Sequence, residues 1–152
     1  MKMYLPFGDW SDDGHGKYKN VLIEAPSMEH LLEAQIALKE KYGQFFFNGM
    51  AENYDEPYFS EEVWQALIDT NYPVERFAIA QDTCEWDEMT NLREVLAADS
   101  NPWVSLDCVI DAFIWLLNAY GAEITLSNED IPMICNWTCH GFETVGYGCF
   151  YE

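Results

Sequence analysis

The apolar run at residues 103–120, WVSLDCVIDAFIWLLNAY, constrains the fold more than any other segment of this chain. Pro102 at a first-turn position and Gly121 after the last residue predict one long helix across the run. Apolar side chains occur on nearly every side of that helix, which is typical of a helix that other elements cover. We therefore expect it to be the central helix of the core.

A polar strip interrupts this apolar helix. At 100° per residue, Asp107, Asp111 and Asn118 fall within about 40° of one another on its surface. Two carboxylates at i, i+4 destabilise an exposed helix by roughly 0.2–0.5 kcal/mol. Either the helix meets water along this strip, or the two aspartates receive an arginine of a partner, bind a cation or share a proton.

Shorter patterns predict the remaining elements. Ser27 and Ser60 are expected N-cap residues of two helices. Asp82, with Glu85 three residues on, matches the capping box of a third. The expected helices span residues 27–42, 60–70, 82–98 and 103–120. The expected strands span residues 19–25, 44–48, 74–81, 122–126 and parts of 133–151. We therefore predict an α+β fold, a single compact domain over residues 1–152 with about four helices packed on a small mixed sheet.

The charge of the chain is divided unequally along its length. Residues 1–42 hold seven acidic and five basic residues, whereas residues 43–152 hold 20 acidic residues against two bases, Arg76 and Arg93. A net charge of −20 disfavours direct binding to nucleic acid or to anionic membranes, because both require lysine and arginine. Either the charge is a solubility trait, or it is retained for a basic partner.

Two groups of acidic residues are candidates for a partner site. One is interleaved with aromatic rings before and at the start of the helix at 60–70, and the other follows Asp82. Carboxylates can pair with arginine, and rings can add cation–π contacts. Spread evenly, the acids would lie at one per roughly 290 Å², against one charge per roughly 110 Å² on duplex DNA, so mimicry requires clustering on one face. The candidate partner-binding residues are Glu52, Tyr54, Asp55, Glu56, Tyr58, Glu61, Glu62, Glu85, Asp87 and Glu88.

In its acidity the chain resembles, as a class, small inhibitors that imitate nucleic acid, such as phage anti-restriction and anti-CRISPR proteins, and immunity proteins against basic nuclease toxins. The resemblance implies a non-enzymatic binding protein without a cofactor. Its partner would be a basic, nucleic-acid-binding or nuclease protein whose lysines and arginines the carboxylates cover. This inhibitor is our leading hypothesis, and it leaves the oligomeric state open.

The alternative is a small metal-dependent or thiol enzyme. Its candidate residues lie near the C-terminus: Cys135, Cys139, His140 and Cys149. Three thiolates and an imidazole suit tetrahedral zinc, although the repeated C-x₂₋₄-C pair of zinc fingers is missing. A Cys–His pair from the same residues could instead supply a nucleophile and its base. The loop at residues 8–17 resembles a calcium loop but lacks the order of an EF-hand.

Cysteine usage bears on the cellular compartment. The five cysteines are an odd number, and the N-terminal residues contain no apolar segment of the length that a secretion signal needs. No uninterrupted apolar run approaches 18 residues, because Asp107 and Asp111 interrupt the segment at 103–120. We therefore expect a cytoplasmic protein with reduced thiols and no membrane span.

Overall fold

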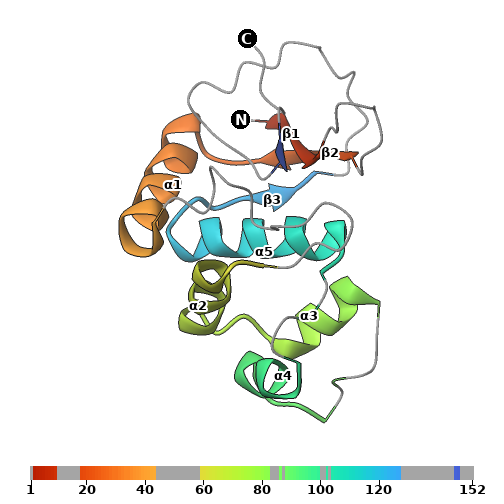
Figure 1. The fold of residues 1–152 in the computed structure, drawn as a ribbon. Helices are drawn as coiled ribbons and strands as arrows, with labels where there is room; N and C mark the ends of the chain where they lie inside the picture. The colour runs from red at the N-terminus through yellow and green to blue at the C-terminus, as the bar shows by residue number, and fades with distance from the viewer. Residues whose placement is uncertain are drawn as a thin grey trace.

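A mixed sheet forms one side of the protein (Figure 1). This computed structural model describes residues 2–9, 18–43, 59–82, 86, 88–99, 102, 104–127 and 146–147. β1 (Lys2–Asp9) and β2 (Tyr18–Glu24) pair antiparallel. β3 (Thr125–Leu126) pairs antiparallel with β2, and β4 (Gly146–Tyr147) pairs parallel with β1. The order of the strands is therefore β3-β2-β1-β4.

The long apolar helix is central, as predicted. α5 (Leu106–Ala119) contacts α1 (Met28–Tyr42) and β1 on one side and the helices of a further layer on the other (Figure 1). Phe113, Leu116 and Leu117 on α5 have no solvent exposure. A helix covered from both sides can be apolar nearly all round, which explains the composition of this segment.

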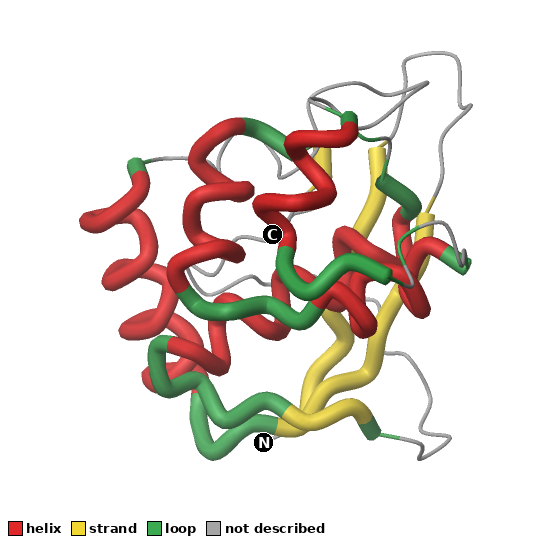
Figure 2. Tube along the Cα trace, turned by 90° about the horizontal axis from the view of Figure 1, so that it is seen from below, coloured by secondary structure: helices red, strands yellow, loops and turns green. Residues whose placement is uncertain are grey.

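Three short helices lie on the side of α5 that faces away from the sheet (Figure 1). They are α2 (Glu61–Asp69), α3 (Val74–Gln81) and α4 (Leu92–Ala98), and we call them together the helical layer. Seen from the side of α4, helices occupy most of the face and the strands gather at one side (Figure 2). The order of layers is thus sheet, then α1 and α5, then the helical layer.

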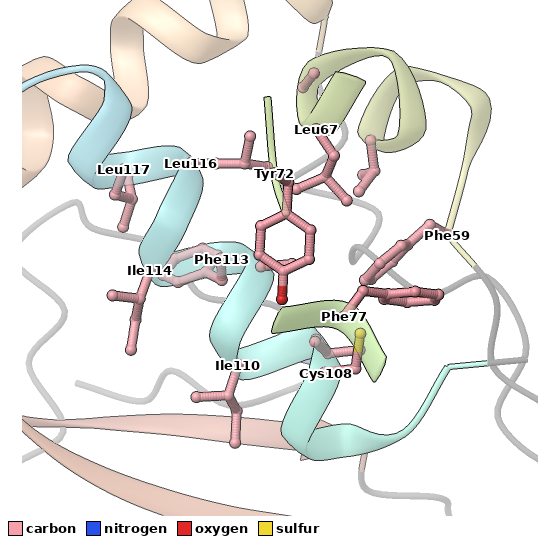
Figure 3. Close-up of a cluster of buried hydrophobic side chains, with 14 of the residues drawn as sticks. Phe59, Leu67, Tyr72, Phe77, Cys108, Ile110, Phe113, Ile114, Leu116 and Leu117 are labelled. Carbon is pink, nitrogen blue, oxygen red and sulfur yellow. The ribbon is translucent and has the colours of Figure 1, made fainter. Parts of the chain in front are cut away.

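Aromatic side chains hold the helical layer against α5 (Figure 3). Trp64 on α2 makes edge contacts with Phe59 and Phe77, with ring centroids 5.1 and 5.6 Å away. Phe77 on α3 is stacked on Trp86 at 4.8 Å. Truncating a buried aromatic residue of this kind costs about 3–5 kcal/mol, so the layer is a firm part of the core.

Several local predictions are confirmed. The hydroxyl of Ser27 accepts the backbone N–H of His30 at 3.2 Å, and that of Ser60 accepts the N–H of Val63 at 3.4 Å, so both serines cap their helices. α1 ends before Gly43, whose φ of 93° favours glycine. The α+β class and the small mixed sheet are also as predicted.

The expected strand at residues 74–81 is wrong, because this segment is α3. Ile79 is 81% exposed, although Phe77, two residues before it, is fully buried. The buried residues are Val74, Phe77 and Ala78, which follow the i, i+3, i+4 spacing of a helix. The described residues therefore form five helices instead of about four.

The boundaries of two other helices also need correction. Asp82 does not open a helix but closes α3 in the left-handed conformation, with φ at 52°, and α4 begins only after Asn91. α5 begins at Leu106 because Ser105 is its N-cap: the hydroxyl accepts the N–H of Cys108 at 3.1 Å and donates to the carbonyl of Ala80 at 3.0 Å.

The N-terminal strand β1 was not predicted, because Pro6 and Gly8 are both unfavourable within a strand. The expected strand at residues 122–126 is shorter than predicted, because only β3 forms there. The expected strand at residues 44–48 lies outside the described residues, as do the expected strands of 133–151 other than β4.

Candidate functional site: the acidic helical layer

The helical layer carries acidic side chains on its surface. All eight of its described carboxylates are exposed: Glu61, Glu62, Asp69, Glu75, Asp82, Glu88, Glu94 and Asp99. Two bases, Arg76 and Arg93, accompany these eight acids, whereas β1, β2 and α1 together hold five acidic and four basic residues, so this layer is far more acidic than the sheet and α1. Among the described residues, the acidic helices therefore lie on the side of α5 that faces away from the sheet (Figure 1).

Three of the predicted partner-binding residues are therefore on this layer. Glu61 and Glu62 lie in the first turn of α2, and Glu88 lies before α4. The other predicted residues lie outside the described ranges: Glu52, Tyr54, Asp55, Glu56, Tyr58, Glu85 and Asp87. Their placement stays a prediction.

Acidic residues at the N-terminal ends of helices have a local role. Glu61, Glu62 and Glu75 lie in first turns, where the helix dipole favours a negative charge by roughly 0.3–1 kcal/mol. Glu94 in the first turn of α4 accepts the backbone N–H of Thr90 at 2.8 Å and its hydroxyl at 3.1 Å. Part of the acidity of the layer is thus explained by helix stability.

The helix dipole does not explain the aspartates at the C-terminal ends of the same helices. Asp69 is the last residue of α2, Asp82 is the C-cap of α3 and Asp99 is the C-cap of α4. None of these three helices has a basic residue in its last turn. Because the dipole is negative at this end, each aspartate is placed against the local preference. We call Asp69, Asp82 and Asp99 the C-terminal aspartates.

Asp69 is held in a defined orientation. Tyr42 on α1 donates its hydroxyl to Oδ2 of Asp69 at 2.9 Å, and Gln65 donates Nε2 to Oδ1 at 2.8 Å. Tyr120 lies behind this pair, with its hydroxyl 3.5 Å from that of Tyr42. The hydrogen bond from Tyr42, followed by that from Gln65, lowers the pKa of Asp69. The carboxylate is therefore exposed, oriented and ionised.

Arg76 is partly exposed, but its charge is offset by an ion pair with Asp111 of the same chain. Its Nε and Nη2 donate to the two oxygens of Asp111 at 2.7 and 2.8 Å, and its guanidinium lies 5.1 Å from the ring centroid of Trp115. Tyr72 also donates its hydroxyl to Asp111. The hydrogen bonds to Asp111 raise the pKa of Arg76, and burial raises that of Tyr72.

The ion pair with Arg76 identifies the partner of Asp111. The sequence left open whether Asp107 and Asp111 meet water, receive an arginine of a partner, bind a cation or share a proton. Asp111 receives an arginine of its own chain, which packs α3 onto α5. Asp107 is exposed in the first turn of α5, and the side chain of Asn118 is hydrogen-bonded to the backbone N–H and carbonyl of Ile124.

The described residues offer neither a metal-binding group of side chains nor a reactive thiol. No group of three or more histidine, cysteine, aspartate or glutamate side chains among them could hold a metal ion. Cys108 is a buried free thiol whose pKa is raised by burial, so it is a poor nucleophile. The predicted ligand candidates Cys135, Cys139, His140 and Cys149, and most of the loop at 8–17, lie outside the described residues.

Comparisons with known proteins do not assign this chain to a family: no family model, no curated protein and no solved structure matches it. Within the described part of the chain, no helix is both long and apolar enough to cross a membrane. The class that the fold and surface define is therefore an α+β domain with an acidic helical layer.

Proposed function

We propose that this protein is a cytoplasmic, non-enzymatic inhibitor that binds a basic protein through its acidic helical layer. The partner is a nucleic-acid-binding or nuclease protein. The carboxylates bind the partner's lysines and arginines in place of the phosphates of nucleic acid. One observation carries the proposal: eight exposed carboxylates share one layer, and one of its two arginines is paired with Asp111 of the same chain.

The C-terminal aspartates add a second line of support. Negative charge at the C-terminal end of a helix lowers stability by roughly 0.3–1 kcal/mol, so helix energetics alone would select against Asp69, Asp82 and Asp99. Their presence on three successive helices is understandable if they contribute to binding. The negative ends of the helix dipoles then add to the field that attracts a cationic surface.

Electrostatic complementarity of this kind mainly accelerates association and selects the partner. Because the charges are exposed, salt should weaken the complex strongly. The internal arrangement of Asp69, Tyr42 and Gln65 reduces the entropy lost on binding, since that carboxylate is already oriented.

The test is capture of the partner with the full chain. Tagged protein is incubated with a nuclease-treated lysate and washed at low and at high salt. We expect retention of a basic nucleic-acid-binding protein that is lost as salt rises. Addition of the full chain should then block that partner's binding to nucleic acid. If the captured protein binds nucleic acid equally well in the presence of a saturating amount of this chain, the inhibitor proposal is wrong.

A further inference from the structure

An exposed isoleucine lies in the last turn of α3. Ile79 is 81% exposed, more than the other exposed large apolar residues among those described, Ile36 at 54% and Leu126 at 60%. Single exposed apolar residues are ordinary on protein surfaces, so the exposure alone says little. What distinguishes Ile79 is the charge around it.

Two exposed carboxylates flank Ile79 in the sequence. Glu75 precedes it by four residues, which is the spacing of neighbours on a helix surface, and Asp82 follows three residues later as the left-handed C-cap that ends α3. Arg76, three residues before Ile79, is the base nearest to it along the helix, and Asp111 binds its guanidinium on the side of α5. The surface around Ile79 therefore combines one apolar side chain, two carboxylates and an arginine whose charge is offset by Asp111.

In the part of the chain that the structure describes, the core does not include Ile79. Its side chain is almost fully outside the core, and a β-branched residue is a poorer helix former than glutamine or lysine. Interfaces that are held together by charge commonly contain a small apolar centre, since an apolar contact stabilises a complex even where salt screens the ion pairs.

We infer that Ile79 is the apolar centre of the partner contact, and that it receives an apolar side chain from a basic amphipathic helix of the partner. Glu75 and Asp82 pair with lysines or arginines on either side of that contact. This inference rests on the proposed function, because it locates the centre of the same binding surface. Charge complementarity selects the occupant: a second copy of this acidic chain would be repelled.

The test uses two peptides with the same number of lysines. One is oligolysine, and the other is a helical peptide in which leucines at i, i+3, i+4 and i+7 form an apolar stripe beside the lysines. Fluorescence anisotropy measures the affinity of each for the full-length wild-type protein, for Ile79→Gln and for Ile36→Gln. Ile36→Gln is the matched control, because it removes an exposed isoleucine from α1.

We expect the wild-type protein to bind the amphipathic peptide more tightly than oligolysine. Ile79→Gln should weaken binding of the amphipathic peptide about tenfold and leave oligolysine unaffected, since burial of an isoleucine contributes at least that much. Ile36→Gln should change neither. In methyl NMR spectra, the amphipathic peptide should shift the signal of Ile79 and not that of Ile36.

The outcomes separate this inference from the proposal beneath it. If both peptides bind but Ile79→Gln leaves their affinities unchanged, the acidic surface stands and the role of Ile79 is wrong. If neither peptide binds even at low salt, both the acidic binding surface and its apolar centre are wrong. Both substitutions are at exposed positions, so circular dichroism should show unchanged folding.

Discussion

The two sides of this protein follow the rules of helix electrostatics differently. α1, beside the sheet, has Glu29 in its first turn and Lys39 and Lys41 in its last, as the helix dipole favours. The helices of the helical layer also begin with acidic residues, but they end with aspartates and have no base in their last turns. The difference is that two lysines outnumber the single acid, Glu40, at the end of α1, whereas no base offsets the aspartates at the ends of the layer helices.

The largest expected effect on stability comes from replacing Arg76, and the matched replacement of Arg93 should have little effect. Arg76→Ala leaves the carboxylate of Asp111, which is 28% exposed, without its ion pair and removes the contact with Trp115. We expect a loss of about 2 kcal/mol in the free energy of unfolding, measured by denaturant titration.

Arg93→Ala is the control for this experiment, because it removes the same charge from an exposed position on α4. Its effect should stay within about 0.5 kcal/mol. Equal losses for the two variants would contradict the internal role that we assign to Arg76.

Neutralising acids at the two ends of α3 should have opposite effects. Asp82→Asn relieves an unfavourable charge at the C-terminal end and keeps a residue that tolerates the left-handed conformation, so it should stabilise the protein by about 0.3–1 kcal/mol. Glu75→Gln removes a favourable charge from the first turn and should destabilise it by a similar amount. A loss of stability in both variants, measured by thermal unfolding, would remove the distinction between the two ends.

The orientation of Asp69 should be visible in its titration, which is the smallest of these effects. The folded-state pKa of Asp69 lies below the unfolded value of about 3.9. Ionised Asp69 therefore stabilises the folded protein above that pH, and this stabilisation is lost as pH falls through the folded pKa. Tyr42→Phe removes the first cause of the shift and should raise the pKa of Asp69, measured by carboxyl NMR.

Tyr120→Phe serves as the control for Tyr42→Phe. Tyr120 lies near the hydroxyl of Tyr42 at 3.5 Å, and no hydrogen bond joins it to Asp69 among those described. We therefore expect a smaller change in the pKa of Asp69. If Tyr42→Phe leaves that pKa unchanged, the hydrogen bond does not orient the carboxylate in solution.

Short-range signals in the sequence were sufficient for part of this fold. Ser27 and Ser60 could be identified as caps because a cap involves residues only three apart. The central position of α5 follows from its apolar composition. The α+β class required only the approximate number of elements, so it survived the wrong prediction for residues 74–81.

Long-range contacts were beyond the reach of the sequence. Arg76 and Asp111 are 35 residues apart, and their pairing depends on how α3 packs on α5. The C-terminal aspartates were missed for a related reason. Asp82 was interpreted as the start of a helix, so its place at the negative end of α3 could not be recognised until the segment before it proved helical.

The most direct test compares two neutralised variants for their affinity toward oligolysine. One carries Asp69→Asn, Asp82→Asn and Asp99→Asn on the helical layer, and the other carries Glu24→Gln, Glu29→Gln and Glu33→Gln on β2 and α1. Both lose three charges, so nonspecific attraction falls equally. We expect calorimetry at moderate salt to show about a tenfold or greater loss of affinity for the first variant and about twofold for the second. Equal losses would mean that the charge acts as a whole, and that the helical layer is not the binding surface.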